Sequence, residues 1–192
     1  TVSIVKGDGD AGLDLLRHST AHVMAQAVMD LFGRDNVRLG IGPTIKSGFY
    51  YDFDFADGRR LKEEDLQRIE KRMQEIIDAD QAFVREEVSK EHALKTWGDR
   101  DDRFKCELIT DFPEDETISF YHNEAGGSEA FIDLCRGPHV PSTGKLKAHF
   151  KLLNIAGAYW RGDERTPMMQ RVYAACFAAK KALKTHLHTQ ET

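Results

Sequence analysis

The sequence of 192 residues predicts an α+β fold, in which a mainly antiparallel sheet packs against a central helix and other helices. The central helix is expected to carry two histidines four residues apart, in a HxxxH pattern. Some segments repeat apolar residues every three or four positions, which is the spacing of one helix face. Other segments alternate apolar and polar residues or are rich in aromatic and β-branched residues, which is typical of strands. Helices and strands follow no regular alternation, so repeated strand–helix–strand units are not expected.

The first half of the chain contains the clearest helical patterns. Apolar residues recur at helical spacing over 13–32, and a glycine ends that pattern. A segment rich in glycine and proline follows, and the aromatic run 48–55 after it is expected to form a strand. A strongly amphipathic helix is predicted over 62–78, because its apolar residues share one stripe. A short strand over 83–88 and a short helix over 90–97 complete this half.

The second half of the chain is predicted to be richer in strands. The segment 104–109 is short and is expected to be either a helix or a strand. Strands are expected over 118–122 and 130–135, with a glycine pair between them that is typical of a loop. β-branched and aromatic residues predict two further strands, over 149–159 and 169–177. A helix over 178–187 is predicted to end the chain.

The composition is that of an ordinary globular protein, with 41% hydrophobic and 31% charged residues. No segment approaches the roughly 20 apolar residues that a membrane span needs, and the first residues show no secretory signal. The three cysteines contain no CxxC pair, and their odd number argues against a disulfide framework. These features predict a cytoplasmic protein that has no membrane partner.

Charge is distributed unevenly along the chain. Residues 1–135 carry 17 basic and 29 acidic residues, whereas residues 136–184 carry 10 basic residues and only Asp163 and Glu164. This separation predicts that the later segment supplies a face for an anionic partner, for which Lys151 and Arg161 are candidate contacts. A solvated basic surface on an acidic protein is the alternative interpretation.

Four side chains with metal-ligand chemistry occur as two pairs of equal spacing. His18 and His22 lie four residues apart, so a helix would place both imidazoles on one face. Cys135 and His139 repeat this spacing across a Gly-Pro loop. Together these residues, called the quartet below, form a plausible tetrahedral zinc set. A pair of core histidines without a catalytic role is the alternative interpretation of His18 and His22.

A hydrolytic site here would differ from that of the metalloproteases. The segment between His18 and His22 lacks the glutamate that serves as general base in the HExxH motif. Water would therefore need another activating group. The candidates are an imidazole of the quartet, Asp133 or a lysine with a lowered pKa.

Five segments spread over nearly the whole chain resemble the second N-terminal domain of bacterial threonyl-tRNA synthetases, which is an editing domain. A related module with the same quartet spacing occurs in alanyl-tRNA synthetases and their freestanding deacylase relatives. The segments GFYYDFD and GAYWRGDE favour the threonyl family. The five matching segments are RHSTAHVMAQAV (17–28), IGPTIKSGFYYDFD (41–54), LKEEDLQRIEKRM (61–73), FIDLCRGPHVPSTG (131–144) and FKLLNIAGAYWRGDE (150–164).

The resemblance implies proofreading hydrolysis. Threonine and serine differ by one methyl group, which a binding pocket distinguishes by only about 1–3 kcal/mol. The implied reaction is therefore attack of water on the aminoacyl ester of tRNA(Thr) mischarged with serine, at a site that excludes threonine by the clash of its methyl group. The implied partners are the acceptor end of tRNA(Thr) and the rest of the synthetase chain.

The resemblance also implies roles for individual residues. The quartet forms the site, and Lys105 is a further catalytic residue that helps to position or activate water. Asp133 holds the α-amino group of the substrate, and Tyr51 lines the pocket, although a tyrosine at this position is equally compatible with a place in the core. A lysine among histidines and a cysteine would have a lowered pKa. The threonyl family resembles a metal-free version of the site, so no cofactor is expected, with zinc at the quartet as the alternative.

The resemblance also suggests how the chain is divided. Residues 1–9 are expected to be the tail of a preceding small domain, and residues 10–192 an editing domain that ends in a helix toward a catalytic core outside the chain. An excised module of a longer synthetase is therefore expected, and a freestanding trans-editing deacylase is one alternative. A zinc-dependent hydrolase or lyase for small molecules and a tRNA-binding module without catalysis are the others.

Overall fold

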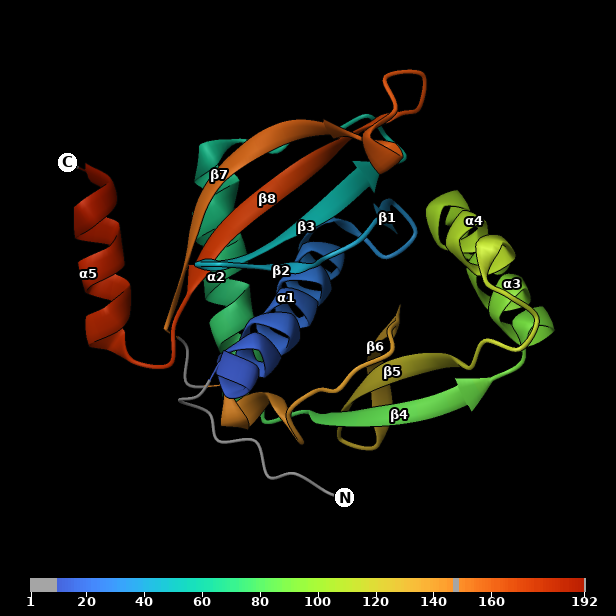
Figure 1. Ribbon diagram of the computed structural model, residues 1–192, viewed down its shortest axis with the longest axis horizontal. Helices are drawn as coiled ribbons and strands as arrows, with labels where there is room; N and C mark the ends of the chain where they lie inside the picture. Colours follow the sequence, from blue (N-terminus) through green and yellow to red (C-terminus); the bar gives the residue numbers. More distant parts are fainter. Residues whose placement is uncertain (1–9, 147–148, 192) are drawn as a thin grey trace.

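Two antiparallel sheets, instead of the single sheet that was predicted, form the framework of the protein in its computed structural model (Figure 1). The structure describes residues 10–146 and 149–191, so the predicted tail over 1–9 lies outside the described residues. The α+β class is confirmed, since helices pack against sheets whose strand pairs are antiparallel. None of the helices in these two described ranges is long and apolar enough to cross a membrane.

The larger sheet has the strand order β1-β3-β8-β7, and β2 pairs with β3 beside β1. Alternate residues of β3 are buried aromatic side chains that belong to the main core, as the alternating pattern predicts. β1 and β2 were not predicted, because strands of three and two residues are too short to show a pattern. The strands of this sheet are β1 (Val37–Leu39), β2 (Thr44–Ile45), β3 (Gly48–Phe55), β7 (Phe150–Tyr159) and β8 (Met168–Cys176).

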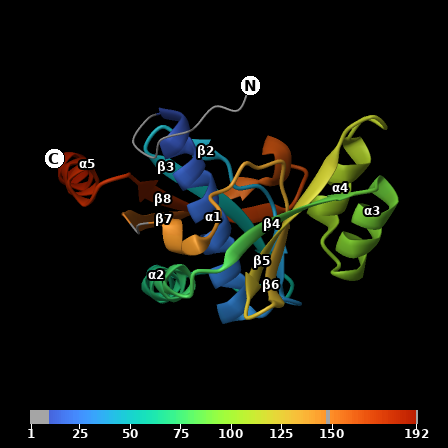
Figure 2. The same cartoon turned by 90° about the horizontal axis from the view of Figure 1, so that it is seen from below.

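Helices α1 (Asp10–Phe32) and α2 (Glu63–Asp78) lie on one side of the larger sheet (Figures 1 and 2). α2 buries a single stripe of apolar residues, as its sequence predicts. α1 is the central helix of the fold, because it contacts α2, strands of the larger sheet and β6 of the smaller one. Every residue from Ser19 to Met29 is buried as a result.

The smaller sheet has the order β4-β5-β6, with strands β4 (Ala82–Val88), β5 (Ile118–Ala125) and β6 (Ser128–Leu134). A two-residue turn joins β5 to β6 through Gly126 and Gly127, whose φ angles are +60° and +81°. Positive φ at both central positions is the geometry that selects glycine in such hairpins.

Helices α3 (Lys90–Asp99) and α4 (Arg103–Asp111) form a second core with the smaller sheet, around Trp97 and Phe120. The segment 104–109, which was expected to be either a helix or a strand, lies within α4 and is a helix. Asp102 caps the start of this helix by accepting a hydrogen bond from the backbone N–H of Lys105. Helix α5 (Lys180–Glu191) projects from the edge of the molecule near its C-terminus (Figure 1). Two short 3₁₀ helices cover Thr143–Lys145 and Trp160–Gly162.

Candidate active site

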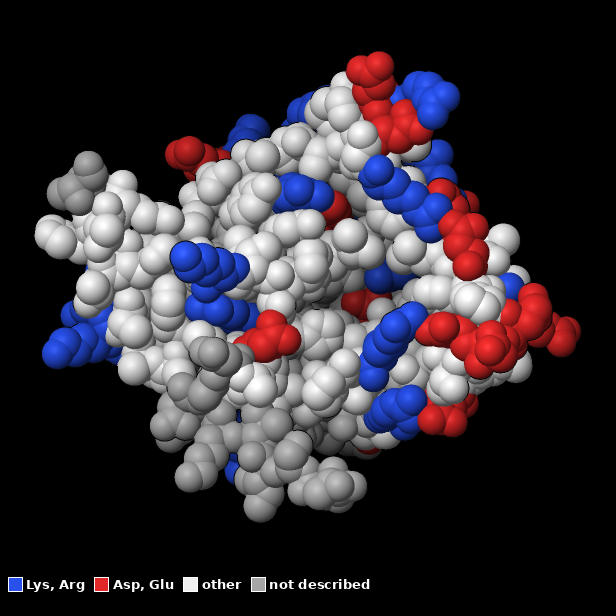
Figure 3. All heavy atoms as spheres, viewed as in Figure 1, with Lys and Arg blue, Asp and Glu red and all other residues white. Residues whose placement is uncertain are grey.

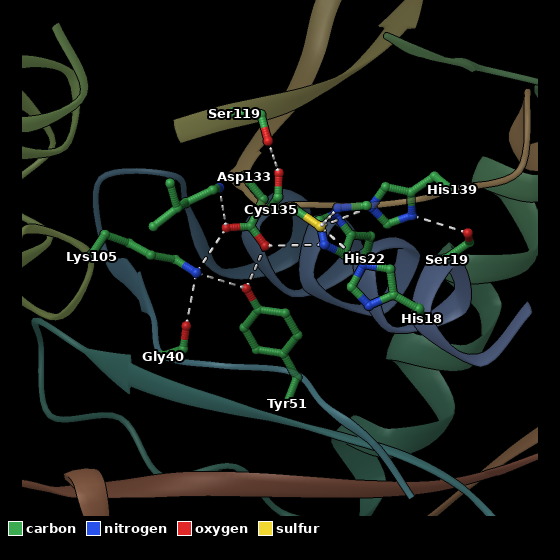
Figure 4. A network of polar contacts seen from close by, with 12 residues as sticks. His18, Ser19, His22, Gly40, Tyr51, Lys105, Ser119, Asp133, Cys135 and His139 are labelled. Atoms are coloured by element: carbon green, nitrogen blue, oxygen red, sulfur yellow. Dashed lines mark hydrogen bonds and ion pairs between the residues drawn. The ribbon is translucent and has the colours of Figure 1, made fainter. Parts of the chain in front are cut away.

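The seven side chains predicted to form the site come together where α1 passes the end of β6 (Figure 4). Six of them line one cavity of about 220 Å³. His139 is outside this lining and lies behind Cys135, 3.3 Å from its sulfur. The lining residues from the prediction are His18, His22, Tyr51, Lys105, Asp133 and Cys135.

The quartet is assembled from one helix and one loop. α1 supplies His18 and His22, and the loop after β6 supplies Cys135 and His139, so that the four potential ligand atoms lie within 4.8 Å of one another. His18 Nε2 is 2.9 Å from Cys135 Sγ, and the rings of His18 and His139 stack with centroids 4.4 Å apart.

Hydrogen bonds around the quartet fix its orientation. Ser19 Oγ lies 3.0 Å from His139 Nδ1 and accepts a hydrogen bond from the backbone of Val140. The backbone N–H of Gly137 donates to Cys135 Sγ. Gly137 has a φ of +75°, and a Cβ atom there would lie 2.2 Å from the hydroxyl of Tyr121. Only glycine therefore lets this loop turn tightly enough to bring the thiol and the imidazole together.

The donor set of the quartet fits a zinc ion. Three imidazoles and one thiol are soft nitrogen and sulfur ligands, and their mutual distances are compatible with one shared ion. His22 Nδ1 is also buried without a hydrogen-bond partner among the described residues. Buried polar atoms are rarely left unpaired, so this nitrogen is consistent with a ligand or a water at the site.

A buried ion pair lies beside the quartet. Lys105 Nζ is 2.9 Å from Asp133 Oδ1, and the two side chains are only 3% and 2% exposed. Lys105 also donates a hydrogen bond of 2.8 Å to the carbonyl oxygen of Gly40. Both of these partners are acceptors, which matches the donor groups of a lysine side chain, and Lys105 lines the cavity.

Asp133 connects this ammonium to the other groups of the site. The hydroxyl of Tyr51 donates to Asp133 Oδ2 at 2.6 Å, and the backbone N–H of Leu134 donates to Oδ1 at 2.8 Å. His22 Nε2 lies 3.5 Å from Oδ2. Tyr51 is buried in the main core and also lines the cavity.

Burial keeps the quartet uncharged. Desolvation raises the pKa of the Cys135 thiol to about 12, and the nearby charge of Asp133 adds to this effect. Desolvation lowers the pKa of His22 and His139, and repulsion between neighbouring imidazoles lowers both further. The pKa of His18 is lowered by the same desolvation, partly opposed by Asp133. At neutral pH the site therefore offers a neutral thiol and neutral imidazoles.

Other lining residues were not singled out from the sequence. Ile41 and Gly42 come from the segment before β2, and Leu108 and Phe112 come from α4 and its end. Apolar side chains in a short helix carry no signal that separates a cavity wall from a core. Gly42 had a weak signal, because it lies in the Gly/Pro-rich segment GIGPT.

The basic segment after residue 135 does not present free charges at the two predicted contact positions. Arg161 pairs with Glu107 at 3.2 Å and with Asp111 at 2.5 Å, and Lys151 pairs with Glu70 at 3.3 Å. On the face that is hollowed near its centre, basic and acidic side chains are interspersed (Figure 3). The acidic partners all lie within the acidic segment 1–135, so folding offsets part of the charge separation seen along the sequence.

Comparisons with known proteins place the chain among tRNA synthetase domains. A family described as the second additional domain of threonyl and alanyl tRNA synthetases matches residues 118–173. The chain is 50% identical over 191 residues to a threonine–tRNA ligase of Exiguobacterium sp., covering 99% of the chain and 28% of that protein. It is 53% identical over 191 residues to the threonine–tRNA ligase of Halalkalibacterium halodurans, again covering 28% of that protein. The corresponding protein of Thermotoga maritima is 50% identical over 174 residues, which cover 91% of the chain and 26% of that protein.

Proposed function

Because the chain belongs to the family of the second additional domain of threonyl and alanyl tRNA synthetases, we propose that it edits aminoacyl-tRNA as part of a threonine–tRNA ligase. Its substrate is tRNA(Thr) mischarged with serine, and it hydrolyses the ester between the amino acid and the terminal ribose. The chain spans about 28% of the length of the ligases of Exiguobacterium sp. and Halalkalibacterium halodurans. Its partners are the acceptor end of tRNA(Thr) and the rest of the ligase chain.

The observation that carries this proposal is the pairing of neutral imidazoles with a buried ammonium in one cavity. Water attacks the ester carbonyl carbon, and an imidazole of His18 or His22 takes a proton from that water. The bond from the carbonyl carbon to the ribose oxygen then breaks, and the imidazolium returns its proton to the ribose oxygen. Lys105 supplies positive charge where the negative charge of the tetrahedral intermediate develops, which favours this step.

Asp133 serves as the acceptor for the substrate's α-ammonium group. A carboxylate has about four lone-pair sites. Lys105, Tyr51 and the backbone of Leu134 already donate to it, which leaves room for one more donor. The same carboxylate holds Lys105 and Tyr51 in place, so it would orient the ammonium relative to the attacked carbonyl.

The reaction needs no metal in this scheme, since the imidazoles and Lys105 supply the base and the charge. The alternative is a zinc hydrolase, which the geometry of the quartet favours. The quartet would then hold the ion, and zinc would lower the pKa of a bound water. One zinc per chain in active protein after washing with a chelator would overturn the metal-free scheme.

In this proposal, a rigid wall beside the ester site excludes threonine. Gly42 and Tyr51 both line the cavity, and a Cβ atom at Gly42 would lie 2.2 Å from the ring of Tyr51. Tyr51 is itself fixed by its hydrogen bond to Asp133. A wall without spare volume rejects an added methyl group by overlap, which is how a second site separates serine from threonine.

Single-turnover deacylation of Ser-tRNA(Thr) and Thr-tRNA(Thr) tests this function. We expect hydrolysis of the seryl ester alone, and loss of that hydrolysis in His22→Ala and Cys135→Ala with little change in tRNA affinity. Cys106→Ala is the matched control, because this thiol lies between α3 and α4 outside the cavity lining. Hydrolysis of neither ester refutes the proposal, and equal hydrolysis of both refutes the exclusion of threonine.

A further inference from the structure

Three buried polar side chains on and beside α1 lack hydrogen bonds that they can make. Within the part of the chain that the structure describes, no partner exists for His22 Nδ1, for Gln26 Oε1 or for either polar atom of the Asn123 amide. All three side chains are at most 3% exposed. Buried polar atoms are paired in nearly all folded proteins, with an ordered water where no protein group serves. A water molecule is therefore the expected partner.

Asn123 lies behind the quartet, on the face of the smaller sheet that packs against α1. It is the register partner of Phe83 on one side and of Phe131 on the other, so the three side chains form a row on one face. The Phe83 ring stacks on His139 with centroids 4.8 Å apart. The Phe131 ring meets His22 edge-on with centroids 6.0 Å apart. The amide of Asn123 lies between these two rings and therefore points toward the same imidazoles.

Gln26 approaches this row from the helix. It follows His22 by one turn of α1, so the two side chains share one face of the helix. Its Nε2 donates a hydrogen bond of 2.8 Å to Gln81 Oε1, and Gln81 precedes Phe83 by two residues at the start of β4. This bond anchors Gln26 beside the row and leaves its amide oxygen as an acceptor.

His22 differs from the other imidazoles of the quartet in its hydrogen bonds. His18 and His139 both contact Cys135 Sγ, at 2.9 and 3.3 Å. His22 makes no hydrogen bond within residues 10–146 and 149–191, and its Nε2 lies 3.5 Å from Asp133 Oδ2, beyond the usual length of such a bond (Figure 4). Nε2 is thus on the side of the cavity, and the atom that needs a partner is Nδ1.

We propose that Gln26 and Asn123 position the His22 imidazole through one buried water molecule. The water donates its two protons to Gln26 Oε1 and Asn123 Oδ1, so it can only accept a hydrogen bond from His22 Nδ1. Three hydrogen bonds are the usual number for a buried water. A neutral imidazole carries one proton, so a proton on Nδ1 leaves the lone pair of Nε2 facing the cavity. Gln26 and Asn123 are therefore positioning residues.

The opposite tautomer would oppose the reaction. A proton on Nε2 would point toward the Asp133 carboxylate, and His22 would have no lone pair in the cavity. Since the carboxylate favours that tautomer, the opposing hydrogen bond has to come from behind the ring. This consequence rests on the proposed function, and it assigns to His22 the proton transfer from the attacking water.

Heteronuclear NMR of the imidazole nitrogens tests the tautomer, because protonated and unprotonated ring nitrogens differ in chemical shift. We expect the proton of His22 on Nδ1 in the unaltered protein. Asn123→Leu and Gln26→Leu each remove one acceptor of the water, which frees a water proton for Nδ1 and should shift His22 toward the Nε2 tautomer. Thr20→Val is the matched control, because this buried hydroxyl of α1 bonds to Leu16 and faces Cys176, so the tautomer should stay unchanged.

Single-turnover deacylation of Ser-tRNA(Thr) measures the effect on the reaction. Each leucine variant should slow the hydrolysis step by about tenfold, as expected for the loss of one hydrogen bond. The tRNA concentration that gives half the maximal rate should stay unchanged, because neither side chain lines the cavity. The double variant should be no slower than the slower single variant, since both residues act through one water. Circular dichroism and thermal unfolding establish that each variant is folded.

The outcomes distinguish the water site from the proposed function. A proton on Nε2 in the unaltered protein overturns the water site, and this measurement needs no variant to fold. A proton that stays on Nδ1 in every folded leucine variant overturns it as well. Hydrolysis of Ser-tRNA(Thr) with either result leaves the proposed function standing alone. The expected tautomer and its expected shift, without any hydrolysis, remove the deacylase function and retain the water site.

Discussion

Replacing Lys105 by methionine tests whether a buried ion pair holds the site together. The Lys105 and Asp133 side chains are 3% and 2% exposed and their charged atoms are 2.9 Å apart. Removing one partner of such a pair leaves a buried charge without compensation and typically costs about 3–5 kcal/mol. Tyr51 and the Leu134 backbone still donate to the carboxylate, so we expect Lys105→Met to lower the free energy of unfolding by about 3 kcal/mol, the lower end of this range.

Urea unfolding at pH 7, followed by tryptophan fluorescence, measures this change. The second variant is Asp133→Asn, and the third combines both substitutions. Since the cost comes from the charge left behind, the double variant should be more stable than the sum of the single changes predicts. The control is Lys95→Met, whose ion pair with Asp99 is 74% and 67% exposed and should contribute nothing measurable. A cost for Lys105→Met as small as that of the control would refute the reasoning, as would strict additivity.

Three further predictions concern the cap of α4, the wall of the cavity and pH. Asp102→Ala should lower the free energy of unfolding by about 1–3 kcal/mol, because Asp102 caps α4 and accepts a hydrogen bond from the backbone of Leu39. An unchanged midpoint of the urea unfolding curve would contradict this. Gly42→Ala should displace the Tyr51 ring and slow seryl-tRNA hydrolysis, with no loss of fold by circular dichroism. Burial lowers the pKa of His139, so the unfolded chain binds more protons below its ordinary pKa near 6.5. Stability should therefore be constant above that pH and fall as the pH decreases from 6.5 to 5, with a smaller fall in His139→Asn.

Most helices and longer strands could be predicted from local patterns, because their burial follows one face. The periodicity of α2 and the alternation of β3 are examples, and both elements have nearly the predicted bounds. The division into two sheets could not be predicted, since pairing is decided by contacts between distant segments. The identity of the segment 104–109 was also undecided, because it depends on the cap that Asp102 provides and on packing against the smaller sheet.

The candidate site shows the same limit. The spacing of the histidines and of Cys135 with His139 led to the prediction of one shared site, and the four ligand atoms do lie together. The ion pair between Lys105 and Asp133 was not foreseen, because the spacing of the two residues in the sequence carries no pattern. The acceptor role of the Gly40 carbonyl could not be predicted at all, since a backbone oxygen has no sequence signature.

The origin of the quartet has a consequence for the order in which the chain assembles. His18 and Cys135 are 117 residues apart, and Ser19 and His139 are 120 residues apart. Contacts between such distant residues form late, because the loop between them must first be closed. During synthesis, which proceeds from the N-terminus, α1 emerges long before the thiol does. A growing or truncated chain that ends before β6 thus displays the two imidazoles of α1 but lacks the carboxylate of Asp133 and the thiol of Cys135.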